Sequence, residues 1–173
     1  ARNEENLRTV IEMLPAERGQ QHNYLVADFA DFENFKPLII NWFEDNQVDI
    51  LINNTNGPAA GGVLDKTTDD YQQSFDLLFK TVSFVTMEAL RKMQVAKYGR
   101  IINLSSISVK EPIQNLVLSN SIRSAVLSWA KTLAREVAPM GITVNNILTG
   151  YFDTERLNEV HKAQSESKGI DLQ

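Results

Sequence analysis

Short apolar segments that alternate with amphipathic segments constrain the fold of this chain most strongly. The apolar segments are rich in Val, Ile and Leu and end in polar residues; they cover residues 24–28, 48–53, 100–106 and 142–148. Between them, apolar residues recur at intervals of three and four, which indicates helices. The predicted helices cover residues 3–14, 31–46, 68–95, 115–137 and 154–167. Because parallel strands are joined through crossover helices, this alternation predicts an α/β fold: a doubly wound, Rossmann-like parallel sheet in three layers, with helices on both faces and strands buried on both sides.

Composition limits the class of protein. The chain has 173 residues, of which 43% are hydrophobic and 23% charged, as in an ordinary soluble globule, so we predict a single domain over residues 1–173. A net charge of −5 provides no basic surface for nucleic acid, and no apolar run approaches the length of a membrane span. The absence of cysteine excludes disulfides and fits a cytoplasmic location. His22 and His161 have no nearby ligand partners in sequence, so no metal site is expected.

Small polar residues follow each predicted strand. They are Asp28, Asn53 with Asn54, Ser105 with Ser106, and Thr149 with Gly150. In an open parallel sheet the carboxyl ends of the strands face a common crevice, where ligands bind. The sequence therefore predicts a site at this edge of the sheet.

The stretch from Gly99 to Val126 holds the strongest candidate for catalysis. Its strand ends in Ser106, and its helix carries Ser119 and Arg123 four residues apart on one face. Two hydroxyls and a cation at the end of a strand form a typical active-site arrangement in α/β folds. The alternative is ordinary: serines cap helices, and an Arg one turn from a Ser is often a solvated surface pair.

Five motifs in order give the chain a family resemblance. VADFAD, INNTNG, INLSS, LSNSIRSAV and LTGYFDT follow one another at suitable intervals between Arg2 and about Leu157. They resemble landmarks of the short-chain dehydrogenase/reductase family, in a divergent branch similar to 3-oxoacyl-carrier-protein reductases. The resemblance implies an NAD(P)-dependent oxidoreductase that acts on a carbonyl or hydroxyl group of a small or acyl substrate, with 3-oxoacyl compounds as candidates.

The same resemblance implies an atypical active site. The family's catalytic serine corresponds to Ser106, but Ser119 and Arg123 stand where its Tyr-x-x-x-Lys pair is usual, and Leu78 stands where its helix usually carries Asn. A phenol has a pKa of about 10, whereas a serine hydroxyl is a far weaker acid and a guanidinium keeps its proton. We expect Ser106 to hold the substrate oxygen, Ser119 to assist and Arg123 to orient the nicotinamide. The alternative is a catalytically impaired nucleotide-binding or assembly module on the same fold.

The resemblance also implies a cofactor, NADP or NAD. Arg2 would favour a 2′-phosphate and hence NADP, Asp28 would bond adenine, Asn54 and Thr55 would line the nicotinamide ribose with Arg123, and Thr154 would meet the nicotinamide. From the residues alone, plainer interpretations stay open. Arg2 can be a solvated cation, Asp28 and Thr154 helix caps, and Asn54 and Thr55 turn residues.

One part of the family's pattern has no counterpart in the chain. No glycine-rich turn follows a first strand, and Gly61 with Gly62 lacks the spacing to replace it. In the order 3-2-1-4-5-6 the first strand is central, so without it the segments 24–28 and 48–53 would have unpaired edges. We expect a longer polypeptide, of which this chain is a domain truncated at both ends relative to the family, or another chain that fills the gap. As in the family, helices 68–95 and 115–137 are expected to pack against the same helices of other copies of the chain, in a homodimer or homotetramer.

Overall fold

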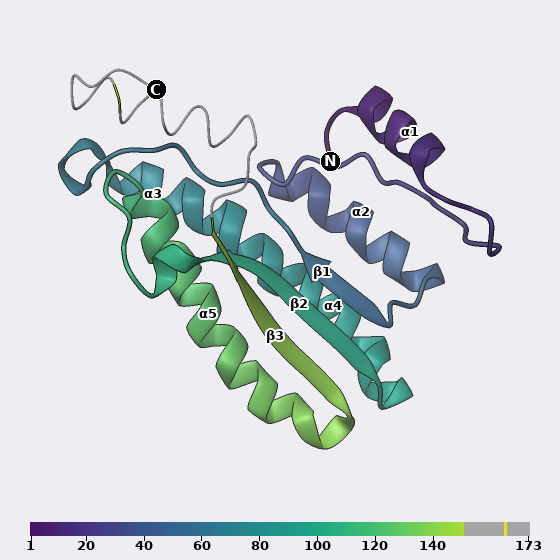
Figure 1. Cartoon of the computed structure of the whole chain (residues 1–173). Helices are drawn as coiled ribbons and strands as arrows, with labels where there is room; N and C mark the ends of the chain where they lie inside the picture. Colours follow the sequence, from purple (N-terminus) through teal and green to yellow (C-terminus); the bar gives the residue numbers. More distant parts are fainter. Residues whose placement is uncertain (151–164, 166–173) are drawn as a thin grey trace. The chain divides into compact units, whose positions relative to one another are not determined.

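A parallel sheet of three strands organises the second part of the chain. In the computed structural model, which describes residues 1–150 and residue 165, the strands are β1 (Ile50–Asn53), β2 (Gly99–Ser106) and β3 (Ile142–Thr149). They are hydrogen-bonded in the order β1-β2-β3 (Figure 1). Asn53 pairs with Asn103 and Ser106 with Thr149, so the strands' carboxyl ends share one edge of the sheet. This order agrees with the last three strands of the doubly wound pattern.

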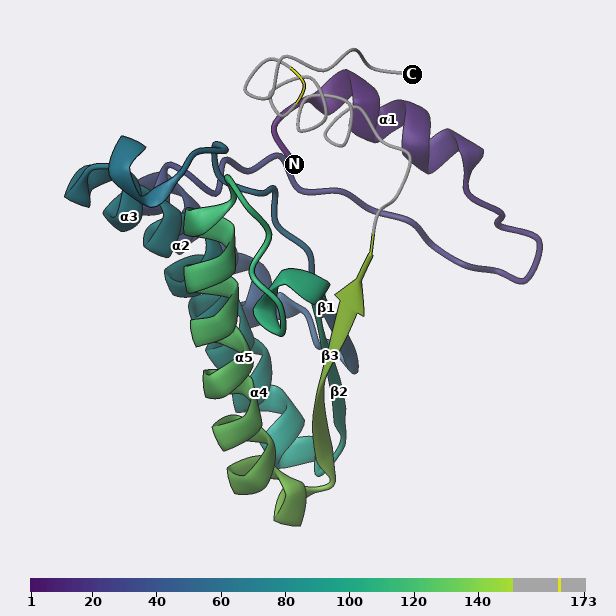
Figure 2. The ribbon, with the colours of Figure 1, turned by 60° about the vertical axis from the view of Figure 1, so that its left-hand side comes forward.

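Two long helices cover one face of this sheet. A continuous helical segment comprises α3 (Thr68–Phe75), a π-helical stretch (Asp76–Lys80) and α4 (Thr81–Ala96), and α5 (Val117–Val137) follows β2. Figure 2 shows α4 and α5 on the same side of the strands. Alternate residues of β2 are buried, Ile101 at 0% exposure and Asn103 at 2% among them. The sheet face that meets the two helices is therefore the core of this part.

The first part of the chain, residues 1–45, is a separate compact unit. It contains α1 (Glu4–Met13), capped by the Asn3 side chain, and α2 (Phe32–Asp45), on which Phe35, Ile39 and Phe43 are buried. The predicted strand over residues 24–28 is wrong, since this segment belongs to no strand of the described residues. Its Ala27 N–H donates to the Ala1 carbonyl over 2.9 Å, and no ladder of such bonds continues through the described residues. A strand needs such a ladder, whatever its side chains.

The predicted fold class is confirmed: the fold is α/β, with a parallel sheet of the Rossmann-like kind and flanking helices. Burial of the strands on both faces is wrong for two of them. Ile50 and Ile52 on β1 are each 57% exposed and Ile147 on β3 is 49% exposed. In the register of the sheet these three residues pair with Arg100, Ile102 and Leu104, which alternate with the buried residues of β2 and so lie on its other face. The apolar sequence predicted where the strands lie, but it did not predict whether one or both faces of each strand are buried.

Smaller differences lie at the ends of the elements. Strand β1 begins at Ile50 rather than at residue 48. Helix α5 begins at Val117 rather than near Asn115, because Asn115 has a positive φ of 61°, which a helix does not accept. The helix predicted over 154–167 lies outside the described residues, apart from residue 165, which is helical. None of the described helices is both long and apolar enough to span a membrane.

Candidate active site

The two serines at the end of β2 lie on opposite faces of the strand, as successive strand residues must. Ser105 is on the buried face and is 6% exposed, and its Oγ has no hydrogen-bond partner among the described residues. Ser106 is half-buried, and its Oγ accepts the N–H of Ser108 over 3.1 Å. That bond uses Ser106 as an acceptor, so its hydroxyl hydrogen remains available to a ligand.

Arg123 connects α5 to this end of β2. Its Nε donates to Ser119 Oγ over 3.2 Å, and its Nη1 donates to the carbonyl of Leu104 over 3.1 Å. The half-buried guanidinium forms no ion pair with any carboxylate of the described residues, and burial lowers the pKa of Arg123 from its usual value. Ser119 and Arg123 are therefore not a solvated surface pair, because the arginine is bonded to the main chain of the sheet.

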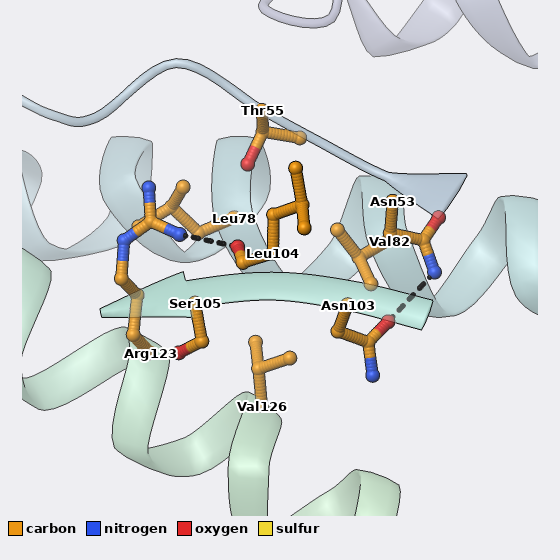
Figure 3. A pocket seen from close by; sticks show the side chains of 9 residues that line it. All are labelled: Asn53, Thr55, Leu78, Val82, Asn103, Leu104, Ser105, Arg123 and Val126. Carbon is orange, nitrogen blue, oxygen red and sulfur yellow. Dashed lines mark hydrogen bonds between the residues drawn. The ribbon is translucent and has the colours of Figure 1, made fainter. Parts of the chain in front are cut away.

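A narrow pocket lies beside the guanidinium. Its polar lining comprises Asn53, Thr55, Asn103, Ser105 and Arg123. In Figure 3 the Arg123 side chain extends from α5 past β2, so that its guanidinium reaches the side on which Thr55 lies. The enclosed space is about 10 Å³, which is close to the least that holds one water molecule. Any larger ligand group must therefore contact Arg123 from the mouth of the pocket.

Leu78 closes the pocket from the helical side. It is 2% exposed and belongs to the π-helical stretch Asp76–Lys80. The hydroxyl of Thr81 donates to the carbonyl of Asp76 over 3.0 Å and so supports the widened turn. π-Helical turns are rare and often occur at functional sites. Here the turn presents an apolar side chain where the resembled family usually carries an amide.

A chain of amides crosses the sheet, and two of its members, Asn53 and Asn103, line the pocket. Asn53 Nδ2 donates to Asn103 Oδ1 over 2.8 Å and to Thr86 Oγ1 over 2.9 Å. Asn103 Nδ2 in turn donates to Asn146 Oδ1 over 3.1 Å, so one side chain from each strand takes part. None of the sequence motifs predicted this network. The signal was an asparagine near the end of each of three apolar runs, at positions that the parallel register pairs.

The predicted cofactor residues fall into both units. Asn54 and Thr55 follow β1, and of these Thr55 lines the pocket together with Arg123. In the first unit, Arg2 Nη1 and Asp28 Oδ2 are 3.9 Å apart; the Arg2 side chain is 69% exposed and that of Asp28 is 42% exposed. Thr154 lies outside the described residues.

The loop that contains Gly61 and Gly62 has no free phosphate cradle. The N–H of Gly61 donates to the Asn115 carbonyl over 2.7 Å, and that of Gly62 donates to Asp65 Oδ2 over 3.0 Å. A phosphate cradle needs such N–H groups unpaired. Gly61 instead joins the loop to residues 115–117.

Comparison with known proteins identifies the family. A parallel α/β sheet with a polar site at its carboxyl edge belongs to the doubly wound nucleotide-binding class. The family model for short chain dehydrogenases matches residues 1–165, and the chain belongs to this family. The resemblance of the motifs to that family is thereby confirmed.

Named relatives show how much of a family member this chain represents. It is 27% identical over 167 residues to the 3-oxoacyl-[acyl-carrier-protein] reductase FabG of Rickettsia conorii, covering 95% of this chain and 66% of the relative. It is 33% identical over 141 residues to the oxidoreductase UcpA of Escherichia coli K12, covering 79% of this chain and 53% of the relative. The chain thus spans about half to two thirds of the length of these relatives.

Solved structures resemble it over nearly its whole length. An actinorhodin polyketide ketoreductase variant with NADPH has a TM-score of 0.86 at 25% identity, covering 98% of this chain and 66% of that one. An NAD+-bound xylitol dehydrogenase has a TM-score of 0.80 at 24% identity, covering 92% and 62%, and at that identity it supports the fold alone.

Proposed function

We propose that the protein is an NAD(P)-dependent oxidoreductase that acts on a carbonyl or hydroxyl group, with a 3-oxoacyl compound as the candidate substrate. The observation that carries this proposal is the set of polar groups at the carboxyl edge of the sheet, where Arg123 bonds Ser119 and shares a pocket with Thr55. A reductase of 3-oxoacyl groups among the relatives, and a neighbouring ketoreductase that carries NADPH, support the reaction class.

Each of the two units, taken by itself, has residues that suit one end of a nicotinamide dinucleotide, which would supply or accept the hydride. On the nicotinamide side, Arg123 has unused N–H donors and Thr55 a hydroxyl, which complement the hydroxyls of a ribose. Asn54 and Thr154 are the further residues that we assign to this side. For the adenosine end we assign Asp28 to the adenine and Arg2 to a 2′-phosphate, which slightly favours NADP. The weak, exposed contact between these two side chains leaves both available to a ligand.

Two hydroxyls can polarise the substrate oxygen. Ser106 accepts from Ser108 and Ser119 accepts from Arg123, so each keeps its own hydrogen for donation. We assign Ser106 to hold the oxygen and Ser119 to assist, directly or through a water. The guanidinium of Arg123 keeps its proton and therefore positions groups without transferring a proton.

A second candidate function rests on the same positions. A serine and a guanidinium at positions 119 and 123 lack the acidity of a phenol, and general acid catalysis contributes about 10²- to 10⁴-fold in rate. A nucleotide-binding or assembly module with little or no turnover is therefore the alternative. Assembly as a homodimer or homotetramer and a cytoplasmic location are further expectations for either function.

Cofactor binding and turnover separate the two functions. The protein is titrated with NADPH and NADH, and oxidation of the bound cofactor is then followed against a panel of ketones, aldehydes and 3-oxoacyl thioesters. We expect saturable binding, and turnover that Ser106→Ala lowers by about 10²-fold, the effect of removing one donor to a developing oxyanion. Ser128→Ala, on an exposed position of α5, is the matched control. Binding without turnover would establish the alternative, and failure to bind either cofactor would refute both.

A further inference from the structure

We propose that Arg123 makes the mouth of this pocket a receptor for an oxyanion, namely a carboxylate or phosphate group of a ligand. This goes beyond a role in orienting a ribose, because it specifies the charge of the ligand. It rests on the proposed function only in assuming that the oxyanion belongs to the substrate or the cofactor.

No carboxylate of the described residues compensates the charge of Arg123. Arg2, Arg8 and Arg91 each lie within ion-pair distance of a carboxylate, and all three are well exposed. Arg123 is more buried than these, yet its two partners are a hydroxyl and a carbonyl, both neutral. Placing a cation away from water without an anion is costly, and proteins usually pair such a group. An anionic ligand would supply the missing partner.

The guanidinium also has donors to spare. It carries five N–H groups, and the bonds to Ser119 and Leu104 use two of them; the other three, on Nη1 and Nη2, have no partner among the described residues. Two neighbouring nitrogens of a planar guanidinium match the two oxygens of a carboxylate or phosphate. A neutral hydroxyl can also accept from these donors, but it brings no charge to balance the guanidinium.

The surroundings strengthen the preference for charge. Leu78, Val82 and Val126 line the pocket, and no acidic side chain is found among the lining residues that the structure describes. An apolar wall lowers the local dielectric, so the attraction between a guanidinium and an anion exceeds that at an exposed site. The bonds to Ser119 and Leu104 already hold the side chain in place, which reduces the conformational entropy lost on binding.

Small anions and a neutral analogue test the receptor without any substrate. The Nε–H resonance of Arg123 is followed by NMR while the protein is titrated with acetate, with inorganic phosphate, and with acetamide, which matches acetate in shape but is uncharged. Ionic strength is held constant so that general screening does not change. We expect a saturable shift with acetate or phosphate and none with acetamide. Equal responses to acetate and acetamide would overturn the proposal without reference to any variant.

Substitutions then assign the binding to one side chain. Arg123→Gln should weaken the anion's binding about tenfold or more, the range for loss of a charge-assisted hydrogen bond, now monitored on backbone amides near β2. Arg123→Lys keeps the charge but not the planar donor pair and should weaken binding less. Arg135→Gln removes an exposed arginine from the same helix and should leave the affinity unchanged. Unchanged affinity in a folded Arg123→Gln protein would refute the assignment.

A last titration identifies the source of the oxyanion. If the oxyanion belongs to the cofactor, saturating NADPH should abolish the acetate and phosphate shifts; if it belongs to the substrate, the shifts should persist. Failure of NADPH to bind would refute the proposed function while leaving the anion titration valid. If NADPH binds but acetate and phosphate show no advantage over acetamide, the proposed oxyanion receptor is refuted and the proposed function is not.

Discussion

Replacement of Asn103 by alanine should lower the free energy of unfolding by about 2–4 kcal/mol, the sum of two neutral hydrogen bonds and part of one desolvation penalty. Asn103 is 2% exposed, accepts from Asn53 and donates to Asn146. Each bond contributes about 1 kcal/mol net, and a buried group left without its partner costs about 1–3 kcal/mol. Asn53 keeps its hydrogen bond to Thr86 when Asn103 is replaced, so its amide is not left without any partner. The expected loss in the free energy of unfolding therefore stays below the upper limit of these contributions.

Urea unfolding, followed by circular dichroism, measures this loss. The matched control is Asn145→Ala, because Asn145 lies on an exposed position of β3 and makes only a long contact of 3.4 Å with Thr143. That change should stay within about 0.5 kcal/mol of the parent, as surface substitutions usually do. A double-mutant cycle of Asn53→Ala with Asn103→Ala should give a coupling energy of about 1 kcal/mol. Equal effects of the Asn103 and Asn145 substitutions, or a coupling of zero, would show that the amide chain does not stabilise the sheet.

Two further predictions concern turns and pH. Gly19 and Gly141 both have positive φ, but only at Gly141 would an added Cβ collide with another group, the Lys97 carbonyl. In urea unfolding, Gly19→Ala should therefore lower the free energy of unfolding by about 1 kcal/mol, and Gly141→Ala should lower it by about 1–3 kcal/mol more. Equal costs would contradict the collision. The N–H and the hydroxyl of Thr67 donate to the Asp70 carboxylate and lower the pKa of Asp70. This capping interaction therefore stabilises the fold at pH values above the ordinary pKa of a carboxyl group. The stabilisation is lost as the pH falls through the lowered pKa of Asp70. Asp70→Asn should therefore flatten the fall in stability below about pH 4, and an acid unfolding curve that is unchanged would contradict this.

The sequence alone was sufficient for the parts of the fold that depend on local pattern. Apolar runs with polar ends located β1, β2 and β3, and helical spacing located the segments that became α4 and α5. The four-residue interval between Ser119 and Arg123 correctly implied proximity, because a helix places such residues on one face. Five ordered motifs were enough to indicate the family that the comparison identified.

The errors came from interactions between distant segments. Residues 24–28 have the composition of a strand but form no ladder of hydrogen bonds with another strand of the described residues, and composition cannot supply one. Likewise, Ile50 and Ile52 are as apolar as a strand with both faces buried requires. Their exposure depends on which elements pack against each face of the strand. Both properties are decided by pairing and packing, which no local pattern contains.

The site divides in the same way. Residue types and spacing determined that hydroxyls and a cation gather at the carboxyl edge of a parallel sheet, because parallel strands end together. Only the tertiary structure decided that Arg123 bonds the Leu104 carbonyl and has no carboxylate partner among the described residues. It also decided that three asparagines from separate strands form one chain of hydrogen bonds, since their contact requires the register of the folded sheet.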